Sequence, residues 1–416
     1  MTEEGRTSVR TMNSSSVDGY RADHDPLAVH ASLRRAIVPA TRAVFHGLRD
    51  RLRPVEVDRI DEVPSRPDLV SDRWLTAALN VATGSRVSGY VYNIVTSGTN
   101  VRGRMEVSYE PNLAATSMST ESQRPQRIFV KSTPGILTRL ANAVTMAGEA
   151  TFYTTLRPEL NGLEIPTGYF SAVDLTTLRS IHLIEDLVAT KGATFPTDPA
   201  VTLTRSQADD AVDLLADVHR IFASKPRRGL PTFVQFWAQA LAIADVGKSI
   251  RAFQTDEFCP AQLRDERSRL WEACLESIRM HDHLPHTLLH NDPHRGNWYV
   301  TGAGRMGLLD WQTTCFGHWS RDLAYALPTL LTVDQRRAWE YDLLCRYRLR
   351  AELDETVDEA WLRYRQQLAG GLLFWAPTLR PPRGFPDMQP RSLAVELLSR
   401  ITAAMVDHGT VALLTR

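Results

Sequence analysis

The sequence is poor in cysteine, with four in 416 residues. They stand far apart and form no C-x-x-C pair: Cys259, Cys274, Cys315 and Cys345. Scattered cysteines of this kind disfavour both a disulfide framework and a zinc ribbon. A reducing cytoplasm is therefore the expected location.

Long apolar runs and an excess of charge are also missing. Nowhere do about eighteen apolar residues follow one another, as a membrane-spanning helix requires. The 48 basic and 48 acidic residues cancel to a formal net charge of zero, so no global field recruits nucleic acid or an anionic membrane. The first residues, MTEEGRTSVR, are acidic where a secretory signal peptide is basic and then apolar. We expect a cytoplasmic protein with neither nucleic acid nor membrane as a partner.

What is present is an ordinary globular composition, 43% hydrophobic and 23% charged, in a chain too long for one small core. Residues 1–25 are polar and Ser-rich, and we expect a tail. Residues 87 to 131 are rich in Val, Tyr, Thr and Gly, which predicts antiparallel strands. Helical periodicity dominates beyond residue 187. We predict an α+β protein with an N-lobe of sheet and helix over 26–186 and a larger, mostly helical C-lobe over 187–416.

The most informative stretch is LLHNDPHRGNWYV, residues 288–300, in which a polar loop separates two apolar segments. This pattern predicts strand, loop, strand. Within it His290, Asp292 and Asn297 form the spacing H-x-D-x-x-x-x-N, and Asp310 follows a second apolar run. A loop of this spacing followed by a strand-end Asp is typical of kinase-type phosphoryl transfer. The pattern assigns a proton-handling carboxylate to Asp292 and oxygen ligands for a metal to Asn297 and Asp310.

Two upstream residues extend this pattern. Lys131 closes an apolar strand, and Glu149 stands in the segment Thr138–Leu156, whose composition favours a helix. A strand Lys followed by a helix Glu is the ion pair that holds the α- and β-phosphates of a nucleotide in kinase folds. Gly98 lies in a turn whose backbone N–H groups can approach phosphates, although a simple hairpin explains that turn equally well.

A strand that stops at an acidic pair suits a hinge between two lobes. Ser180–Ile184 is such a strand, and it runs into Glu185 and Asp186. We expect backbone groups of Glu185 and Leu187 to bind the adenine edge of a nucleotide. Solvated acids at the end of a strand are the alternative explanation.

Five histidines crowd into fourteen residues: His281, His283, His286, His290 and His294. Such a cluster also suggests a metal-dependent hydrolase, whose ligands would come from these spacings. The phosphoryl-transfer interpretation is favoured because it uses the residues between the histidines. Stoichiometric zinc would distinguish the hydrolase.

The motifs together resemble the aminoglycoside phosphotransferase and ecdysteroid-kinase-like family, which is related to choline kinases. The matching residues span about residues 87 to 330: Lys131, Glu149, Leu183–Leu187, His290, Asp292, Asn297, Asp310–Gln312 and Asp322–Tyr325. The resemblance implies a protein-kinase-like bilobal fold that uses ATP, or alternatively GTP, with Mg²⁺. It implies that His290 braces the loop and that Asp322 supports the loop from beneath. Asn291 stands where the aminoglycoside enzymes usually have Gly.

The acceptor implied by this resemblance is a hydroxylated small molecule, such as an antibiotic or another secondary metabolite. A role in antibiotic resistance is one of the options that follow. Trp311, Trp319 and Trp375 offer aromatic walls for it, although aromatics at such spacing are more often core residues. A monomer or a homodimer is expected. A catalytically silent, pseudokinase-like nucleotide-binding module is the non-enzymatic alternative, and the full set of charged site residues argues against it.

Overall fold

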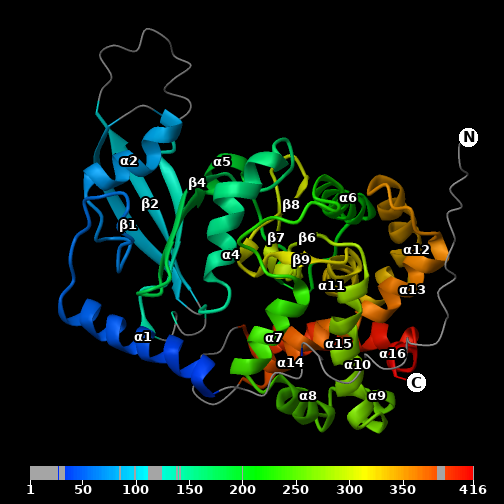
Figure 1. Cartoon of the computed structure of the whole chain (residues 1–416). Coiled ribbons are helices and arrows are strands. Elements are labelled where there is room, and N and C mark those ends of the chain that lie inside the picture. The colour runs from blue at the N-terminus through cyan, green and yellow to red at the C-terminus, as the bar shows by residue number, and fades with distance from the viewer. Residues whose placement is uncertain are drawn as a thin grey trace, which may run out of the picture.

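The computed structural model describes residue 27 and residues 33–83, 86–97, 100–110, 124–136, 139, 142–198, 200–381 and 389–415. Its chain forms a sheet-containing lobe, drawn in blue to cyan in Figure 1, beside a larger helical lobe. The expected α+β architecture is confirmed. The division of the chain after residue 186 stays a prediction.

The N-lobe sheet has five antiparallel strands in the order β1-β2-β3-β5-β4. Their bounds are β1 Val87–Ser97, β2 Val101–Tyr109, β3 Arg127–Ser132, β4 Gly168–Asp174 and β5 Arg179–Glu185. Strand residues alternate between the two faces, and Met105 and Val107 of β2 enter the lobe's core with Ile128 and Val130 of β3. Lys131 of the central strand β3 is paired with Arg102 of β2 on one side and with His182 of β5 on the other.

Two helices precede the sheet, α1 Leu33–Leu52 and α2 Asp72–Thr83. Trp74 and Leu75 of α2 are buried against the sheet. The buried carboxylate of Asp50 ties α1 to the lobe, because it accepts hydrogen bonds from both Arg139 and Arg179. This interaction joins three parts of the chain that are far apart in sequence.

The predicted helix over Thr138–Leu156 is only partly correct. Residues 142–145 form a turn, and α4 runs over Met146–Thr151. It continues as one π turn, Phe152–Leu156, and one 3₁₀ turn, Arg157–Leu160. Thr145 provides no side-chain cap at the start of α4. The position of α4 is set by tertiary packing, since Gly148 of this helix lies directly against the backbone of Gln312 in the C-lobe.

The chain passes from β5 into the C-lobe through α5, Leu187–Lys191. Asp186 caps this helix by accepting the backbone N–H groups of Val188 and Ala189. Both acidic residues at the end of β5, Glu185 and Asp186, are buried, and Asp186 has a structural role as the cap of α5.

The C-lobe is built from helices around one large core that includes Leu288, Trp311 and Leu323. Its helices are α6 Arg205–Ile221, α7 Phe233–Ile243, α8 Val246–Gln254, α9 Ala261–Asp265, α10 Ser268–Arg279, α11 Ser320–Leu330, α12 Val333–Arg350, α13 Val357–Gln367, α14 Gly370–Leu379, α15 Arg391–Asp407 and α16 Thr410–Leu414. Capping boxes open α6 at Thr204 and α12 at Thr332.

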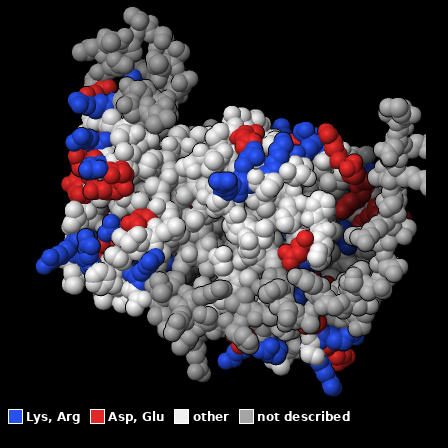
Figure 2. Space-filling view, viewed as in Figure 1, with Lys and Arg blue, Asp and Glu red and all other residues white. Residues whose placement is uncertain are grey.

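Two short hairpin-like sheets sit at the junction of the lobes: β6 Thr287–Leu289 pairs with β9 Cys315–Gly317, and β7 Trp298–Val300 pairs with β8 Met306–Leu308. The loop with the central motif runs between β6 and β7. Among the described helices, none combines the length and apolar composition needed to cross a lipid bilayer. On the face drawn in Figure 2, basic and acidic side chains are interspersed.

Candidate active site

The loop of the central motif begins at His290, directly after β6. This side chain is fully buried. Its Nε2 donates a hydrogen bond to the carbonyl oxygen of Leu309 at 2.9 Å, and its Nδ1 accepts the backbone N–H of Asp292 at 3.2 Å. Burial lowers the pKa of His290, which favours the neutral ring that these two bonds require. The geometry suits a bracing role.

Asp322, in the first turn of α11, lies beneath this loop. Its Oδ2 accepts the backbone N–H of His290 at 2.6 Å, and its Oδ1 accepts that of Asn291 at 2.8 Å. The ring of His219 lies 3.2 Å from the same Oδ2. Because carboxylates bind backbone N–H groups strongly, this fully buried side chain fixes the path of the loop.

Asp292 lies next in the loop, and its side chain is 18% exposed. Its Oδ1 accepts the hydroxyl of Tyr325 at 2.9 Å. The amide nitrogen of Asn297 donates to the carbonyl oxygen of Asp292 at 2.8 Å and reaches its Oδ2 at 3.4 Å. Burial raises the pKa of Asp292 to about 7, against the opposing effects of His290 and the Tyr325 hydrogen bond.

The β7–β8 hairpin brings Asn297 and Asp310 together. Trp298 pairs with Leu308 across it, and the N–H of Leu309 donates to the carbonyl oxygen of Asn297 at 2.9 Å. Asp310 follows with a left-handed backbone, φ +66°, a strained conformation that is common at functional sites. An amide oxygen and a carboxylate at one place are the hard oxygen donors that Mg²⁺ prefers, so these two residues fit a magnesium ion.

Lys131 joins the two lobes at this point. Its Nζ lies 2.7 Å from Glu149 Oε2 on α4 and 2.7 Å from Asp310 Oδ1. All three side chains are at least nine-tenths buried. The expected Lys131–Glu149 ion pair is therefore present. Lys131 also forms an ion pair with Asp310, the predicted metal ligand.

Arg102 of β2 adds a second cation to Asp310, with its Nη2 3.3 Å from Oδ2. Burial acts to raise the pKa of the Asp310 carboxyl, but the charges of Lys131 and Arg102 outweigh it and hold this pKa well below its usual range. Asp310 is thus ionised at neutral pH. The two cations, Lys131 and Arg102, suit the binding of phosphates, and the ionised carboxylate between them suits the binding of a divalent cation.

Some of the backbone groups expected to bind adenine already have hydrogen-bond partners within the protein. The backbone N–H of Glu185 donates to the carbonyl oxygen of Thr167 at 2.9 Å, and the carbonyl oxygen of Leu187 accepts the N–H of Ala193 at 3.1 Å. The side chain of Glu185 also binds the N–H of Thr167. Gly98 lies outside the described residues. Contacts of Gly98, Glu185 and Leu187 with a nucleotide stay predictions.

The sequence matches the model of the family described as "Phosphotransferase enzyme family" over residues 137–369, more than half of the chain. The chain belongs to this family. The resemblance found from the motifs is confirmed, and the hydrolase and pseudokinase alternatives are not favoured. No curated protein matches this phosphotransferase.

Solved structures that are similar to this chain include two kinases and one phosphotransferase. Ethanolamine kinase from Plasmodium vivax is 12% identical, with 76% of this chain and 82% of that chain covered and a TM-score of 0.44. Spectinomycin phosphotransferase APH(9)-Ia, in complex with ADP and spectinomycin, is 12% identical over 83% and 100%, with a TM-score of 0.44. Choline kinase LicA from Streptococcus pneumoniae is 12% identical over 80% and 98%, with a TM-score of 0.43.

Arg102 was missed from the sequence, and Tyr325, which ends the matching segment Asp322–Tyr325, was not predicted to contact Asp292. Tyr325 follows Asp322 by three residues, so both lie on one face of α11, and this spacing was a usable signal. Arg102 lies opposite Lys131 in the sheet register. Its contact with Asp310 spans 208 residues of sequence, and nothing local indicates it.

The three tryptophans proposed as acceptor walls differ in their surroundings. Trp311 is fully buried and stacks on Phe152 with ring centroids 4.1 Å apart, so it is a core residue. Trp319 is also buried, and its Nε1 donates to Glu355. Burial leaves little surface of these rings open to an acceptor, and the role of the three tryptophans as acceptor walls stays a prediction. Trp375 is buried as well, but its ring lies edge-on to His294 in the loop of the central motif, 5.1 Å away.

The histidine cluster is used for packing and bracing. The Nδ1 of His281 accepts the N–H of His318, and that of His294 accepts the N–H of Gly296. The Nε2 of His286 bonds the carbonyl oxygen of His281. Within the described ranges, no group of three or more His, Cys, Asp and Glu side chains is arranged to hold a metal ion. The donor geometry therefore does not support a zinc hydrolase.

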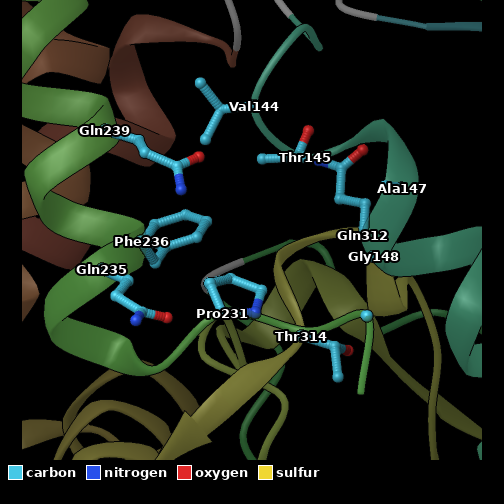
Figure 3. Close-up of a pocket in the computed structure, with 11 residues that line it drawn as sticks. Val144, Thr145, Ala147, Gly148, Pro231, Gln235, Phe236, Gln239, Gln312 and Thr314 are labelled. Carbon is cyan, nitrogen blue, oxygen red and sulfur yellow. The ribbon is translucent and has the colours of Figure 1, made fainter. Parts of the chain in front are cut away.

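A pocket of about 290 Å³ opens beside α4, between the N-terminal end of that helix and α7 (Figure 3). Glutamines face it from α7 and from the segment that follows Asp310. Its lining comprises Val144, Thr145, Ala147, Gly148, Gly229, Pro231, Gln235, Phe236, Gln239, Gln312 and Thr314. Neither Asp292 nor Asp310 lines it.

Proposed function

We propose that this phosphotransferase is an ATP- and Mg²⁺-dependent kinase that transfers the γ-phosphoryl group to a hydroxyl of a small molecule. The observation that carries the proposal is the continuous set of contacts from Glu149 through Lys131 to Asp310, beside the loop that holds Asp292 and Asn297. Phosphoryl transfer depends on positioning and charge neutralisation more than on covalent help from the protein. This site supplies both.

Each residue has a proposed part in the reaction. Lys131 binds the α- and β-phosphates, and Glu149 fixes the position of Lys131. Asn297 and Asp310 hold Mg²⁺, which supplies neutralisation of phosphate charge when it is bound. Asp292 orients the acceptor hydroxyl and receives its proton.

The hydrogen bonds of Asp292 indicate which oxygen performs that task. Oδ1 is occupied by the hydroxyl of Tyr325. Among the described residues, Oδ2 has only the long 3.4 Å contact from Asn297 and lies 3.8 Å from Nε2 of His294. We therefore assign to Oδ2 the role of accepting the proton of the acceptor hydroxyl. Tyr325 orients Oδ2 by binding the other oxygen of the carboxylate.

The acceptor class proposed is a hydroxylated small molecule, with an antibiotic or another secondary metabolite as the leading candidates. GTP is the alternative phosphoryl donor. We also propose a cytoplasmic enzyme that is monomeric or homodimeric. Identification of the acceptor would show whether the enzyme acts in antibiotic resistance, in biosynthesis or in catabolism.

The test is a panel of hydroxylated compounds incubated with the protein, Mg²⁺ and either ATP or GTP. A mass increase of one phosphoryl group in any compound supports the proposal. The Asp292→Ala variant is expected to lose turnover while its affinity for the nucleotide is retained, since Asp292 does not bind the phosphates. The exposed Asp282 of the same lobe offers a matched control, and Asp282→Ala should turn over normally.

Two results would contradict the proposal. Near-normal turnover of Asp292→Ala would exclude Asp292 from the reaction. Nucleotide binding without transfer to any compound, from either donor, would favour the pseudokinase-like module. A chelator should also abolish transfer, and added Mg²⁺ should restore it.

A further inference from the structure

A buried cation without a carboxylate partner stands next to Asp322. Arg321, in the first turn of α11, is fully buried. Among the described residues, no carboxylate lies within ion-pair distance of its guanidinium, and its Nη1 has no hydrogen-bond partner. Its neighbours are aromatic rings, with Tyr325 at 4.4 Å and Phe374 at 5.3 Å from the central carbon. Burying a charge in this way is costly, so the contacts that Arg321 does make call for an explanation.

Those contacts converge on one residue of the loop. The Nε of Arg321 donates to the side-chain Oδ1 of Asn291 at 3.3 Å, and its Nη2 donates to the carbonyl oxygen of Asn291 at 3.1 Å. The planar guanidinium thus binds Asn291 at two points. A lysine has no such fork and cannot reproduce this arrangement.

Asn291 needs this support because its backbone is left-handed, with φ +69°. Glycine takes that conformation without strain, and asparagine is tolerated when its side chain is bonded locally. Here the side-chain Nδ2 donates to the carbonyl oxygen of Thr313 at 3.1 Å, and the backbone N–H donates to Asp322. With the two bonds from Arg321, every polar group of Asn291 is used.

We propose that Arg321 is a positioning residue for Asp292, because it holds Asn291 in the left-handed conformation from which the chain turns into Asp292. The inference rests on the proposed role of Asp292 as the residue that orients the acceptor hydroxyl. Arg321 and Asn291 together replace the conformational freedom that a glycine at position 291 would provide. Arg321 touches neither nucleotide nor acceptor in this proposal.

The contact between Arg321 and Gly370 allows the position of Arg321 to be changed by a substitution outside the loop. Gly370 opens α14, and a Cβ added there would lie 2.8 Å from Nη1 of Arg321. Because the guanidinium is fully buried and a Cβ at that distance is too close, filling this space must displace the guanidinium from its present position. Alanine is a better helix former than glycine, so Gly370→Ala should not weaken α14 itself.

The main test is Arg321→Met, which keeps the length of the side chain and removes the donors. We expect kcat to fall about tenfold or more while the KM for the nucleotide is unchanged, because the phosphate-binding residues are untouched. The melting temperature should fall less than in a variant that breaks a buried ion pair, because the described residues give Arg321 no carboxylate partner and only the two acceptors of Asn291 lose their donors. Adding Asn291→Gly to this variant should restore part of kcat, because glycine adopts φ +69° without help.

A matched control is Arg336→Met in α12. Arg336 is as deeply buried as Arg321, but it pairs with Glu340 and Asp407. Its loss should lower the melting temperature and leave kcat unchanged. Gly370→Ala provides a second route if Arg321→Met folds poorly, and it should lower kcat at a native melting temperature.

Amide hydrogen exchange over residues 288–297 gives a readout that does not depend on activity. Exchange in this peptide should be faster in Arg321→Met than in the wild type, because the N–H groups of His290 and Asn291 lose their fixed geometry against Asp322. Unchanged exchange, or losses of kcat that simply multiply when Asn291→Gly is added, would overturn the positioning role. Faster exchange in a protein whose wild type transfers no phosphate would support the positioning role and contradict the proposed function.

Discussion

The hydroxyl of Tyr325 donates a hydrogen bond to Oδ1 of Asp292 over 2.9 Å. Both partners are held firmly, since Tyr325 is buried in α11 and Asp292 follows residues bonded to Asp322 of the same helix. Helix α11 therefore fixes both the backbone of the loop of the central motif and the side chain of Asp292.

The Tyr325→Phe variant removes this bond and keeps the ring. A hydrogen bond to a charged group contributes about 1.5–3 kcal/mol, so we expect kcat to fall by about 10- to 100-fold. Steady-state kinetics would measure the change. The exposed Tyr341 of α12 provides the control, because Tyr341→Phe should not alter kcat. A Tyr325→Phe enzyme as fast as the wild type would show that the hydroxyl does not orient Asp292.

Arg102 is expected to assist nucleotide binding through its charge. Its side chain is 35% exposed and pairs with Asp310, so solvent screens the interaction. We expect Arg102→Gln to raise the KM for the nucleotide by about threefold to tenfold, with kcat less affected. The effect should shrink as salt is raised.

The control for that variant is Arg127→Gln, which removes an exposed arginine of the same sheet that pairs with Glu106. It should leave the KM unchanged. An Arg102→Gln effect that does not depend on ionic strength would argue against a role of the charge.

Gly148 lies where α4 packs against the segment after Asp310. A Cβ at this position would lie 2.6 Å from the backbone carbonyl oxygen of Gln312, and a backbone atom has little room to give. Gly148→Ala should therefore push α4 away and lengthen the ion pair between Glu149 and Lys131. We expect kcat/KM for the nucleotide to fall by about tenfold or more, with a destabilisation of about 1–3 kcal/mol.

Kinetics and denaturant unfolding would measure both effects of Gly148→Ala. Gly89→Ala in β1 is the comparison, since a Cβ there meets nothing within 4 Å. It should leave both quantities near their wild-type values. Normal nucleotide affinity in Gly148→Ala would mean that α4 tolerates the displacement.

Asp50 gives a prediction for the pH dependence of stability. Burial acts to raise the pKa of Asp50, but hydrogen bonds from Arg179 and Arg139 outweigh it and lower this pKa below its ordinary value. A carboxyl with a lowered pKa in the folded state stabilises the protein above its unfolded pKa of about 4 and loses that contribution as the pH falls below it. Replacing Asp50 by Asn should cost on the order of 3 kcal/mol at neutral pH.

Thermal melting of the wild type and Asp50→Asn across pH would check this. The difference between the two melting temperatures should be largest near neutral pH and should narrow as the pH falls below about 4. A difference that does not change with pH would mean that the charge of Asp50 does not hold α1 on the sheet.

Much of the fold was readable from local patterns. The strands within residues 87 to 131 and at residues 180 to 184 were predicted from their β-branched residues and alternating pattern. Residues 142–145 were misjudged, because composition favours a helix there while close packing of Gly148 on Gln312 decides where α4 lies. Composition carries no information about such a contact.

The candidate site divides in the same way. Asp292, Asn297 and Asp310 were found by spacing within one short stretch, and the Lys131–Glu149 pair by the order of strand and helix. Arg102 could not be found, since its partner is more than two hundred residues away in sequence. The aromatic character of Trp311 indicated a hydrophobic environment, but not whether that environment was a cleft or a core.

The stacking of Phe152 on Trp311, with the rings 3° from parallel, has a consequence for regulation. It joins the π turn after α4 to the residue that follows Asp310, so an outward movement of the helix that carries Glu149 would break this stack. Many kinases are switched on by bringing such a helix into place, often after phosphorylation of a loop. In this chain the helix is already fastened there, so we expect an enzyme that is constitutively active, whose output is set by the supply of nucleotide and acceptor.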